Sequence, residues 1–169
     1  MPNGKISFAD AIVDYTEGSP KCENGDNGGT ADVVLGEANY TIEDRKGFFT
    51  LGCGGTITVR FIDNALTDIE GPDLYIFEVG SEIENTKLEI SKDGVTWINV
   101  GEISGGRAEV DIKDFVKPDE VFYYVRLTDL KTGCNGHWPG ADIDAIAALG
   151  SVVQVTLSSS VLFDVGSYV

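Results

Sequence analysis

Acidic side chains gather in three segments of this sequence, and grouped carboxylates are the oxygen ligands that hard cations prefer. The groups are Asp63, Asp68, Glu70, Asp73 and Glu78; Asp129, Asp142 and Asp144; and Glu23, Asp26 and Asp32. Calcium also takes backbone carbonyl oxygens, which glycine-rich loops supply readily because their backbones turn freely. The composition therefore predicts bound calcium, although no spacing here matches an EF-hand loop.

Glu78 is unusual within the first group. The alternation of residues 73–79 places it on the same strand face as Leu74 and Ile76. A carboxylate on a buried face must be paired or coordinated, so Glu78 and its neighbour Asp73 are candidate metal ligands. The alternative is that Glu78 lies at the end of the strand and reaches solvent.

The segment 131–142 carries the residues best suited to hold a ligand. Trp138 stands in a polar loop, where its ring could serve as an exposed platform for the apolar face of a sugar. His137 is the sole histidine and could stack on the same ligand, although an ordinary surface position is the simpler reading. Asn135 and Asp129 complete the candidate ligand set, and Tyr40 and Asn39 are weaker candidates.

Signs of covalent catalysis are weak. With one histidine, a nucleophilic triad could form only around His137, and no Gly-x-Ser-x-Gly elbow is present. Two carboxylates could hydrolyse a glycoside, but a chain with 28 acidic residues brings such pairs together by chance. The sequence predicts a protein that is not an enzyme.

The charge balance narrows the range of partners. A formal charge of −16 repels nucleic acid and anionic lipid headgroups. The excess acid serves either solubility at an extracellular surface or cation binding, and the two are compatible. We find no apolar run long enough to span a membrane and no export leader at residues 1–5, so we expect either a cytosolic chain or an excised piece of an exported protein.

The three cysteines match no zinc-binding pattern. Cys22 and Cys134 both lie in polar, glycine-rich loops, which makes them the expected disulfide pair in an oxidising compartment. Cys53 follows Leu51 in an apolar setting and is interpreted as a small buried hydrophobic residue.

Short apolar runs separated by 21 glycines predict the elements that position these groups. Residues 5–15 are expected to form a strand or two, and residues 48–63, 73–79, 106–112, 120–130 and 143–149 further strands. Residues 87–101 have the pattern of a hairpin with a tight turn at Asp93-Gly94, and Trp97 in this hairpin is interpreted as a core residue. The fold class predicted is all-β, an antiparallel β-sandwich or jelly roll.

The hairpin "DGVTW" followed by "YVRLTDL" resembles the galactose-binding-like (discoidin-type) jelly roll. The segments "LGCGGTITVRFIDN", "GPDLYIFEVG" and "PGADIDAIAAL" also look like a bacterial cell-surface family of that fold. The tail "VTLSSSVLFDVGSYV" is similar to the first strand of an OmpA-like peptidoglycan-binding domain. We therefore expect a module at residues 1–150 and, at 151–169, a linker with the start of a second domain.

The resemblance implies a structural calcium, with Asp142, Asp144, Asp26 and Asp32 as ligands, and a sugar site in the loops that hold His137 and Trp138. It also implies a bacterial cell-envelope location (periplasm, outer membrane or cell surface), with peptidoglycan bound through the missing domain. The function expected is a non-catalytic, calcium-stabilised module for a glycan or surface polysaccharide. The alternatives are an adhesive spacer that contacts envelope proteins and a glycoside hydrolase that uses paired carboxylates.

Overall fold

The computed structural model describes residues 1–22, 28–43, 45–80 and 84–153, and its regular structure is almost entirely β-strand. One sheet has five strands in the order β1-β3-β10-β6-β7, with every neighbouring pair antiparallel. Its strands are β1 (Ala11–Thr16), β3 (Thr56–Arg60), β10 (Tyr124–Asp129), β6 (Thr86–Ser91) and β7 (Trp97–Ile103).

A second sheet has the order β2-β11-β5-β8, and a third has the order β12-β4-β9. The second contains β2 (Phe49–Thr50), β11 (Asp142–Ala148), β5 (Leu74–Glu78) and β8 (Arg107–Val110). The third contains β12 (Ser151–Val153), β4 (Asn64–Thr67) and β9 (Val121–Phe122). Short 3₁₀ helices occupy η1 (Gly4–Ser7) and η3 (Ala31–Val34).

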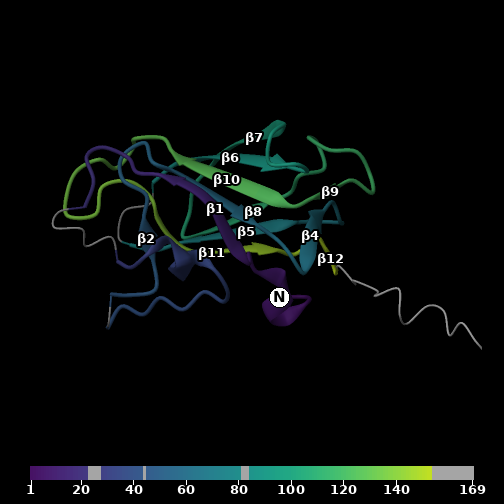
Figure 1. Ribbon diagram of the computed structural model, residues 1–169, viewed down its shortest axis with the longest axis horizontal. Helices are drawn as coiled ribbons and strands as arrows, with labels where there is room; N and C mark the ends of the chain where they lie inside the picture. The colour runs from purple at the N-terminus through teal and green to yellow at the C-terminus, as the bar shows by residue number, and fades with distance from the viewer. Residues whose placement is uncertain (23–27, 44, 81–83, 154–169) are drawn as a thin grey trace, which may run out of the picture.

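The five-stranded and four-stranded sheets stack as two layers, with β4, β9 and β12 at one end of the molecule (Figure 1). Buried side chains of both layers meet in one core, in which Ile57, Val59 and Leu127 face Leu74 and Ile76 from the opposite layer. Alternation along each strand produces this arrangement because successive side chains point to opposite faces. The predicted antiparallel β-sandwich is confirmed.

Most predicted strands appear. Asp93 and Gly94 lie in the connection 92–96 between β6 and β7, which is longer than the tight turn expected, and Gly94 has a positive φ of 75°. Residues 5–15 hold one strand, β1, after the 3₁₀ helix η1. Residues 48–63 hold two strands, β2 and β3, residues 120–130 hold β9 and β10, and β4 was not predicted. Residues 151–153 pair with β4 as β12, while residues 154–169, which carry the predicted start of a second domain, lie outside the described residues.

Several strand ends converge at the end of the sandwich opposite β4, β9 and β12 (Figure 1). In the register, Ile143 of β11 pairs with Glu78 of β5, and Asp142 pairs with Thr50 of β2. The loops that follow β5 and β10 therefore leave the sandwich beside the start of β11. In the part of the chain that the structure describes, no helix has the length and apolar character needed to cross a membrane.

Candidate functional site

A pocket of about 470 Å³ opens among these converging loops. Its described lining residues come from the segment before β2, from either side of residues 81–83, from the loop 135–138 and from the first residue of β11. The lining residues are Tyr40, Ile42, Arg45, Phe48, Val79, Gly80, Glu84, Asn135, Gly136, His137, Trp138 and Asp142. The volume falls within the range of small-molecule sites, about 300–1,000 Å³.

Aromatic rings form one side of the pocket. Phe48 is buried, and its ring centroid lies 5.7 Å from that of Tyr40 and 5.8 Å from that of Trp138, both in edge-to-face geometry. The exposed His137 ring packs against Trp138 at 4.9 Å. The buried Phe48 ring therefore supports two half-buried rings that reach the pocket.

Two buried carboxylates, Glu84 and Asp142, also line the pocket, and Glu78 lies beside them. Glu78 and Asp142 are only 7% and 8% exposed, and Glu84 donates its backbone N–H to Glu78 Oε1 at 2.9 Å. Burial raises the pKa of Glu78 to about 8, and the Glu84 and Asp142 carboxylates add to the rise. Burial also raises the pKa of Asp142 to about 7, although the Thr50 hydroxyl, which donates to its Oδ1, lowers it. The burial predicted for Glu78 is confirmed, and its solvent-exposed alternative is wrong.

Asp144 fixes the loop on the aromatic side. Its Oδ1 accepts the backbone N–H of Asn39 at 2.9 Å, and its Oδ2 accepts that of Tyr40 at 3.2 Å. Burial raises the pKa of Asp144, while these two hydrogen bonds lower it. Both oxygens are therefore engaged in holding the segment that brings Tyr40 to the pocket.

The predicted ligand residues divide into two sets. Trp138, His137 and Asn135 all line the pocket, together with the weaker candidate Tyr40. Asp129 does not: it is 2% exposed, and its carboxylate accepts the backbone N–H groups of Gly54, Lys131 and Ala141. Sequence reasoning missed Arg45, Phe48 and Val79, because no local pattern shows that residues 40–48 fold against the loop 135–138.

Glu78 and Asp142 lie close enough for their charges to interact, but the predicted metal ligands do not form one cluster in the described part of the chain. Asp73 precedes β5 and Glu78 ends it, which separates them by about 16 Å at strand spacing. Asp32 is exposed on η3, and Asp26 lies outside the described residues.

Asp73 instead lies with Asp68 and Asp111, where carboxylate oxygens from the three residues come within 4.8 Å of one another. Asp73 is fully buried, and its two oxygens accept the backbone N–H groups of Ile69 and Ile112. Burial raises the pKa of Asp73, against the lowering by these hydrogen bonds. These three carboxylates offer oxygen ligands of the kind that calcium prefers.

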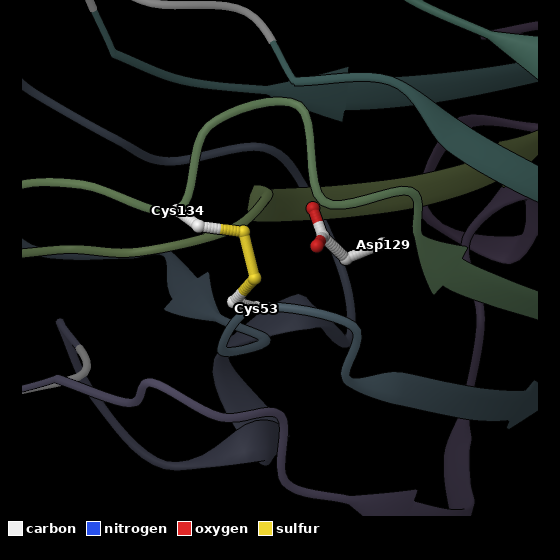
Figure 2. A group of neighbouring side chains, drawn as sticks. All are labelled: Cys53, Asp129 and Cys134. Carbon is white, nitrogen blue, oxygen red and sulfur yellow. A yellow bond between two sulfur atoms is a disulfide. The ribbon is translucent and has the colours of Figure 1, made fainter.

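The disulfide joins Cys53 to Cys134, with 5.2 Å between their Cα atoms (Figure 2). The predicted Cys22–Cys134 pair is wrong, since Cys22 is buried elsewhere without a disulfide. The turn at Cys53 comes so close to the 130–141 loop that a Cβ on Gly140 would lie 2.4 Å from the Gly52 carbonyl oxygen. Glycine at both positions permits this approach, which a local reading of the Cys53 segment does not reveal.

No family model matches this chain, and no curated protein matches it. Among solved structures, it resembles the C-terminal domain of a chitobiase from Bacteroides fragilis, with a TM-score of 0.54 and 17% identity over 89% of this chain and 98% of that one. It also resembles the family 32 carbohydrate-binding module of Streptococcus pneumoniae EndoD, with a TM-score of 0.56 and 14% identity over 85% and 97%.

A fucose-binding module from Streptococcus pneumoniae is similar as well, with a TM-score of 0.52 and 12% identity over 86% of this chain and 94% of that one. At these identities the likeness extends to the fold. The chain therefore shares the β-sandwich architecture of these modules across most of its length.

Proposed function

We propose that this chain is a non-catalytic carbohydrate-binding module whose pocket holds one or two sugar units of a glycan. The observation that carries the proposal is the pairing of exposed ring surface with polar side chains in a single pocket. Sugar rings present apolar C–H faces to aromatic rings and hydroxyl groups to amides and charged groups. Trp138 and Tyr40 supply the first kind of contact, and Asn135 and Arg45 supply the second.

The comparisons support the proposal through the fold, because two of the similar structures are carbohydrate-binding and fucose-binding modules. The carboxylates suit the same role. Asp142 lines the pocket with one oxygen bound by Thr50, so its carboxyl group can accept a hydrogen bond from a sugar hydroxyl. Arg45 lines the same pocket, where its guanidinium group can donate hydrogen bonds to sugar hydroxyl groups.

A glycan array followed by titration calorimetry tests the proposal. We expect Trp138→Ala to weaken binding of the best array glycan by about tenfold or more, as for other buried aromatic anchors. Trp97→Ala is the matched control: it removes the other tryptophan, which lies on β7 outside the pocket, and should leave the affinity unchanged. An array without a bound glycan, or equal affinity in the two variants, contradicts the proposal. Chromogenic glycosides should remain intact.

We also propose that calcium stabilises the module and that it works in the bacterial cell envelope. The Asp68, Asp73 and Asp111 carboxylates support the calcium proposal. The acidic surface and the resemblance of its sequence to cell-surface jelly rolls support the envelope location. Attachment to peptidoglycan through a further domain stays a prediction.

A further inference from the structure

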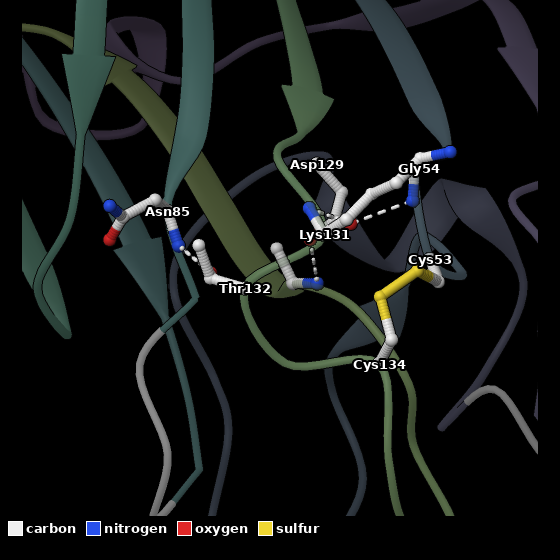
Figure 3. Close-up of a disulfide and its surroundings, with 8 residues drawn as sticks. Cys53, Gly54, Asn85, Asp129, Lys131, Thr132 and Cys134 are labelled. Atoms are coloured by element: carbon white, nitrogen blue, oxygen red, sulfur yellow. Dashed lines mark hydrogen bonds between the residues drawn. A yellow bond between two sulfur atoms is a disulfide. The ribbon is translucent and has the colours of Figure 1, made fainter.

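The loop 130–141 carries four pocket residues, Asn135, Gly136, His137 and Trp138, and both of its ends are hydrogen-bonded to one carboxylate. Asp129 Oδ1 accepts the backbone N–H of Lys131 at 2.9 Å, at the start of the loop, and that of Gly54 at 2.7 Å. Asp129 Oδ2 accepts the N–H of Ala141 at 3.1 Å, at the end of the loop. Figure 3 shows the Lys131 and Gly54 bonds meeting at this side chain. One buried carboxylate therefore joins the base of the loop to the turn that holds Cys53.

The Cys53–Cys134 bridge makes a second, covalent connection between the same two segments. Cys134 directly precedes the pocket residue Asn135. An oxygen of Asp129 lies within 4.8 Å of both sulfur atoms, and Figure 2 shows the carboxylate beside the bridge. The hydrogen bonds of Asp129 and the Cys53–Cys134 disulfide therefore hold the same part of the loop, its base.

Further contacts confine the base of the loop. Asn85 donates its backbone N–H to Thr132 Oγ1 at 2.8 Å, and Gly140 donates to the Gly133 carbonyl oxygen at 2.7 Å. The hydrophobic core, in contrast, draws on both sheets and includes none of residues 131–140. Apart from the contact of Trp138 with the Phe48 ring, these contacts of the loop are polar or covalent and are separate from the packing of the sandwich.

We propose that Asp129 and the Cys53–Cys134 bridge act together as a redox-sensitive clamp that positions Asn135, His137 and Trp138, so that reduction loosens the pocket while the β-sandwich stays folded. Reduction transfers two electrons and two protons from a dithiol to the bridge, breaks the S–S bond into two thiols, and leaves the dithiol as a disulfide. Asp129 is a positioning residue, because it acts on the pocket through the loop. That this loosening lowers glycan affinity rests on the function proposed above.

Hydrogen exchange tests the clamp without any ligand. In the oxidised protein we expect slow exchange at Lys131 and Ala141, whose N–H groups Asp129 accepts. Treatment with dithiothreitol, or the double substitution of Cys53 and Cys134 to serine, should accelerate exchange in residues 131–141 by about tenfold or more, the effect of losing one charge-assisted hydrogen bond. Far-ultraviolet circular dichroism and exchange in the core strands should not change.

The Asp129→Asn variant tests the contribution of the carboxylate separately from that of the disulfide. An asparagine keeps the shape but has one oxygen, so either the Gly54 and Lys131 donors or the Ala141 donor must face an NH₂ group. We expect accelerated exchange in the loop while the disulfide remains intact. Asp93→Asn is the matched control, because Asp93 accepts the backbone N–H groups of Val95 and Thr96 in the β6–β7 turn, at the other end of β6.

A second measurement covers the case in which the serine variant does not fold. In a Trp97→Phe background, Trp138 is the only tryptophan, and its quenching by acrylamide should rise when the folded wild-type bridge is reduced. Unchanged exchange in residues 131–141 and unchanged quenching after reduction would overturn the proposal. Loss of the core exchange pattern on reduction would overturn it as well, since the bridge would then be holding the whole sandwich.

Titration with galactose and N-acetylglucosamine links the clamp to the proposed function. Weaker binding after reduction, or in Asp129→Asn, is expected for whichever sugar the oxidised protein binds, and unchanged affinity would overturn the clamp. If the oxidised protein binds neither of these sugars nor any array glycan, the proposed function fails, whereas the exchange result still decides whether the clamp exists.

Discussion

Buried carboxylates in this protein are of two kinds, distinguished by what hydrogen-bonds to them. Asp73, Asp129 and Asp144 each accept at least two backbone N–H groups and hold loops in place. Glu78 and Asp142 have fewer donors, and neither forms a salt bridge with a cation in the described part of the chain. Burial raises the pKa values of Asp73 and Asp144 as well, but the backbone N–H groups that they accept oppose the rise, whereas Glu78 and Asp142 have less compensation and reach about 8 and about 7.

Glu78 should therefore make stability depend on pH. Its pKa is raised from 4.5 to about 8 on folding, so its contribution is fully present below about pH 4.5 and is lost as the pH rises through about 8. We expect Glu78→Gln to raise the free energy of unfolding relative to wild type at about pH 9, with this advantage shrinking towards about pH 6. Urea unfolding across this range measures the effect.

Glu102→Gln, at an exposed position on β7, is the control and should follow wild type at every pH. A difference between Glu78→Gln and wild type that does not change with pH would show that Glu78 titrates at its ordinary value in the folded protein.

Residue types alone indicated part of the site. Trp138 could be predicted as a pocket residue because a tryptophan in a polar loop is suited to stack on a ligand, whereas an ordinary surface position was the simpler interpretation of His137, which also lines the pocket. The burial of Glu78 could be predicted because its strand face is apolar. The disulfide could not be predicted, because the approach of Gly140 to Gly52 depends on how two distant loops fold. Arg45 was not predicted for the same reason, since its position in the pocket depends on a segment that the Asp144 carboxylate holds in place.

Among the strands, too, features that follow from adjacent residues could be predicted, whereas features that depend on distant contacts could not. The β6–β7 hairpin was predictable because Asp93 and Gly94 mark a chain reversal between two apolar runs, although residues 92–96 form a longer connection than a two-residue turn. Trp97, interpreted from its place in that hairpin as a core residue, instead lies half-buried beneath Arg126, whose guanidinium carbon is 4.0 Å from the ring centroid. This partner comes from β10, two strands away in the sheet order, and such pairings are set by register rather than by local pattern.

This cross-strand cluster should contribute to stability. Glu89 on β6 accepts hydrogen bonds from Lys87 at 2.8 Å and from Arg126 at 2.9 Å. Burial alone would raise the pKa of Glu89, but these partners lower it. We expect Arg126→Met to reduce the free energy of unfolding by about 1–3 kcal/mol at neutral pH, because it removes a partner from a buried carboxylate. The loss should shrink as the pH falls below the ordinary pKa of a glutamate, since protonated Glu89 no longer needs the cation.

Arg107→Met is a close control. Arg107 pairs with Glu109 at 2.6 Å and lies 4.8 Å from the centroid of the Tyr75 ring, but the pair is exposed. Exposed pairs contribute about 0–1 kcal/mol, so urea unfolding should separate the two variants. Equal losses would mean that burial of Glu89 does not strengthen its contacts.

The whole molecule carries a charge of −16, so any added cation should stabilise it to some extent by reducing self-repulsion. A calcium site must therefore be separated from this general effect. We expect calcium to raise the midpoint of thermal unfolding by more than magnesium at the same concentration or sodium at the same ionic strength, and a chelator to reverse the rise. Magnesium is the matched divalent control because it demands a smaller, octahedral set of ligands.

Substitution of Asp68 to asparagine identifies where calcium acts. An ion that binds only to the folded state must stabilise that state. If calcium binds at Asp68, Asp73 and Asp111, the Asp68→Asn variant loses one ligand, so the calcium-specific rise in the unfolding midpoint should shrink while the response to sodium stays the same. A calcium-specific shift that survives Asp68→Asn would place the ion elsewhere in the chain. Equal shifts with calcium and magnesium, unaffected by the substitution, would mean that the carboxylates respond only to charge, and the acidity of the molecule would then serve solubility alone.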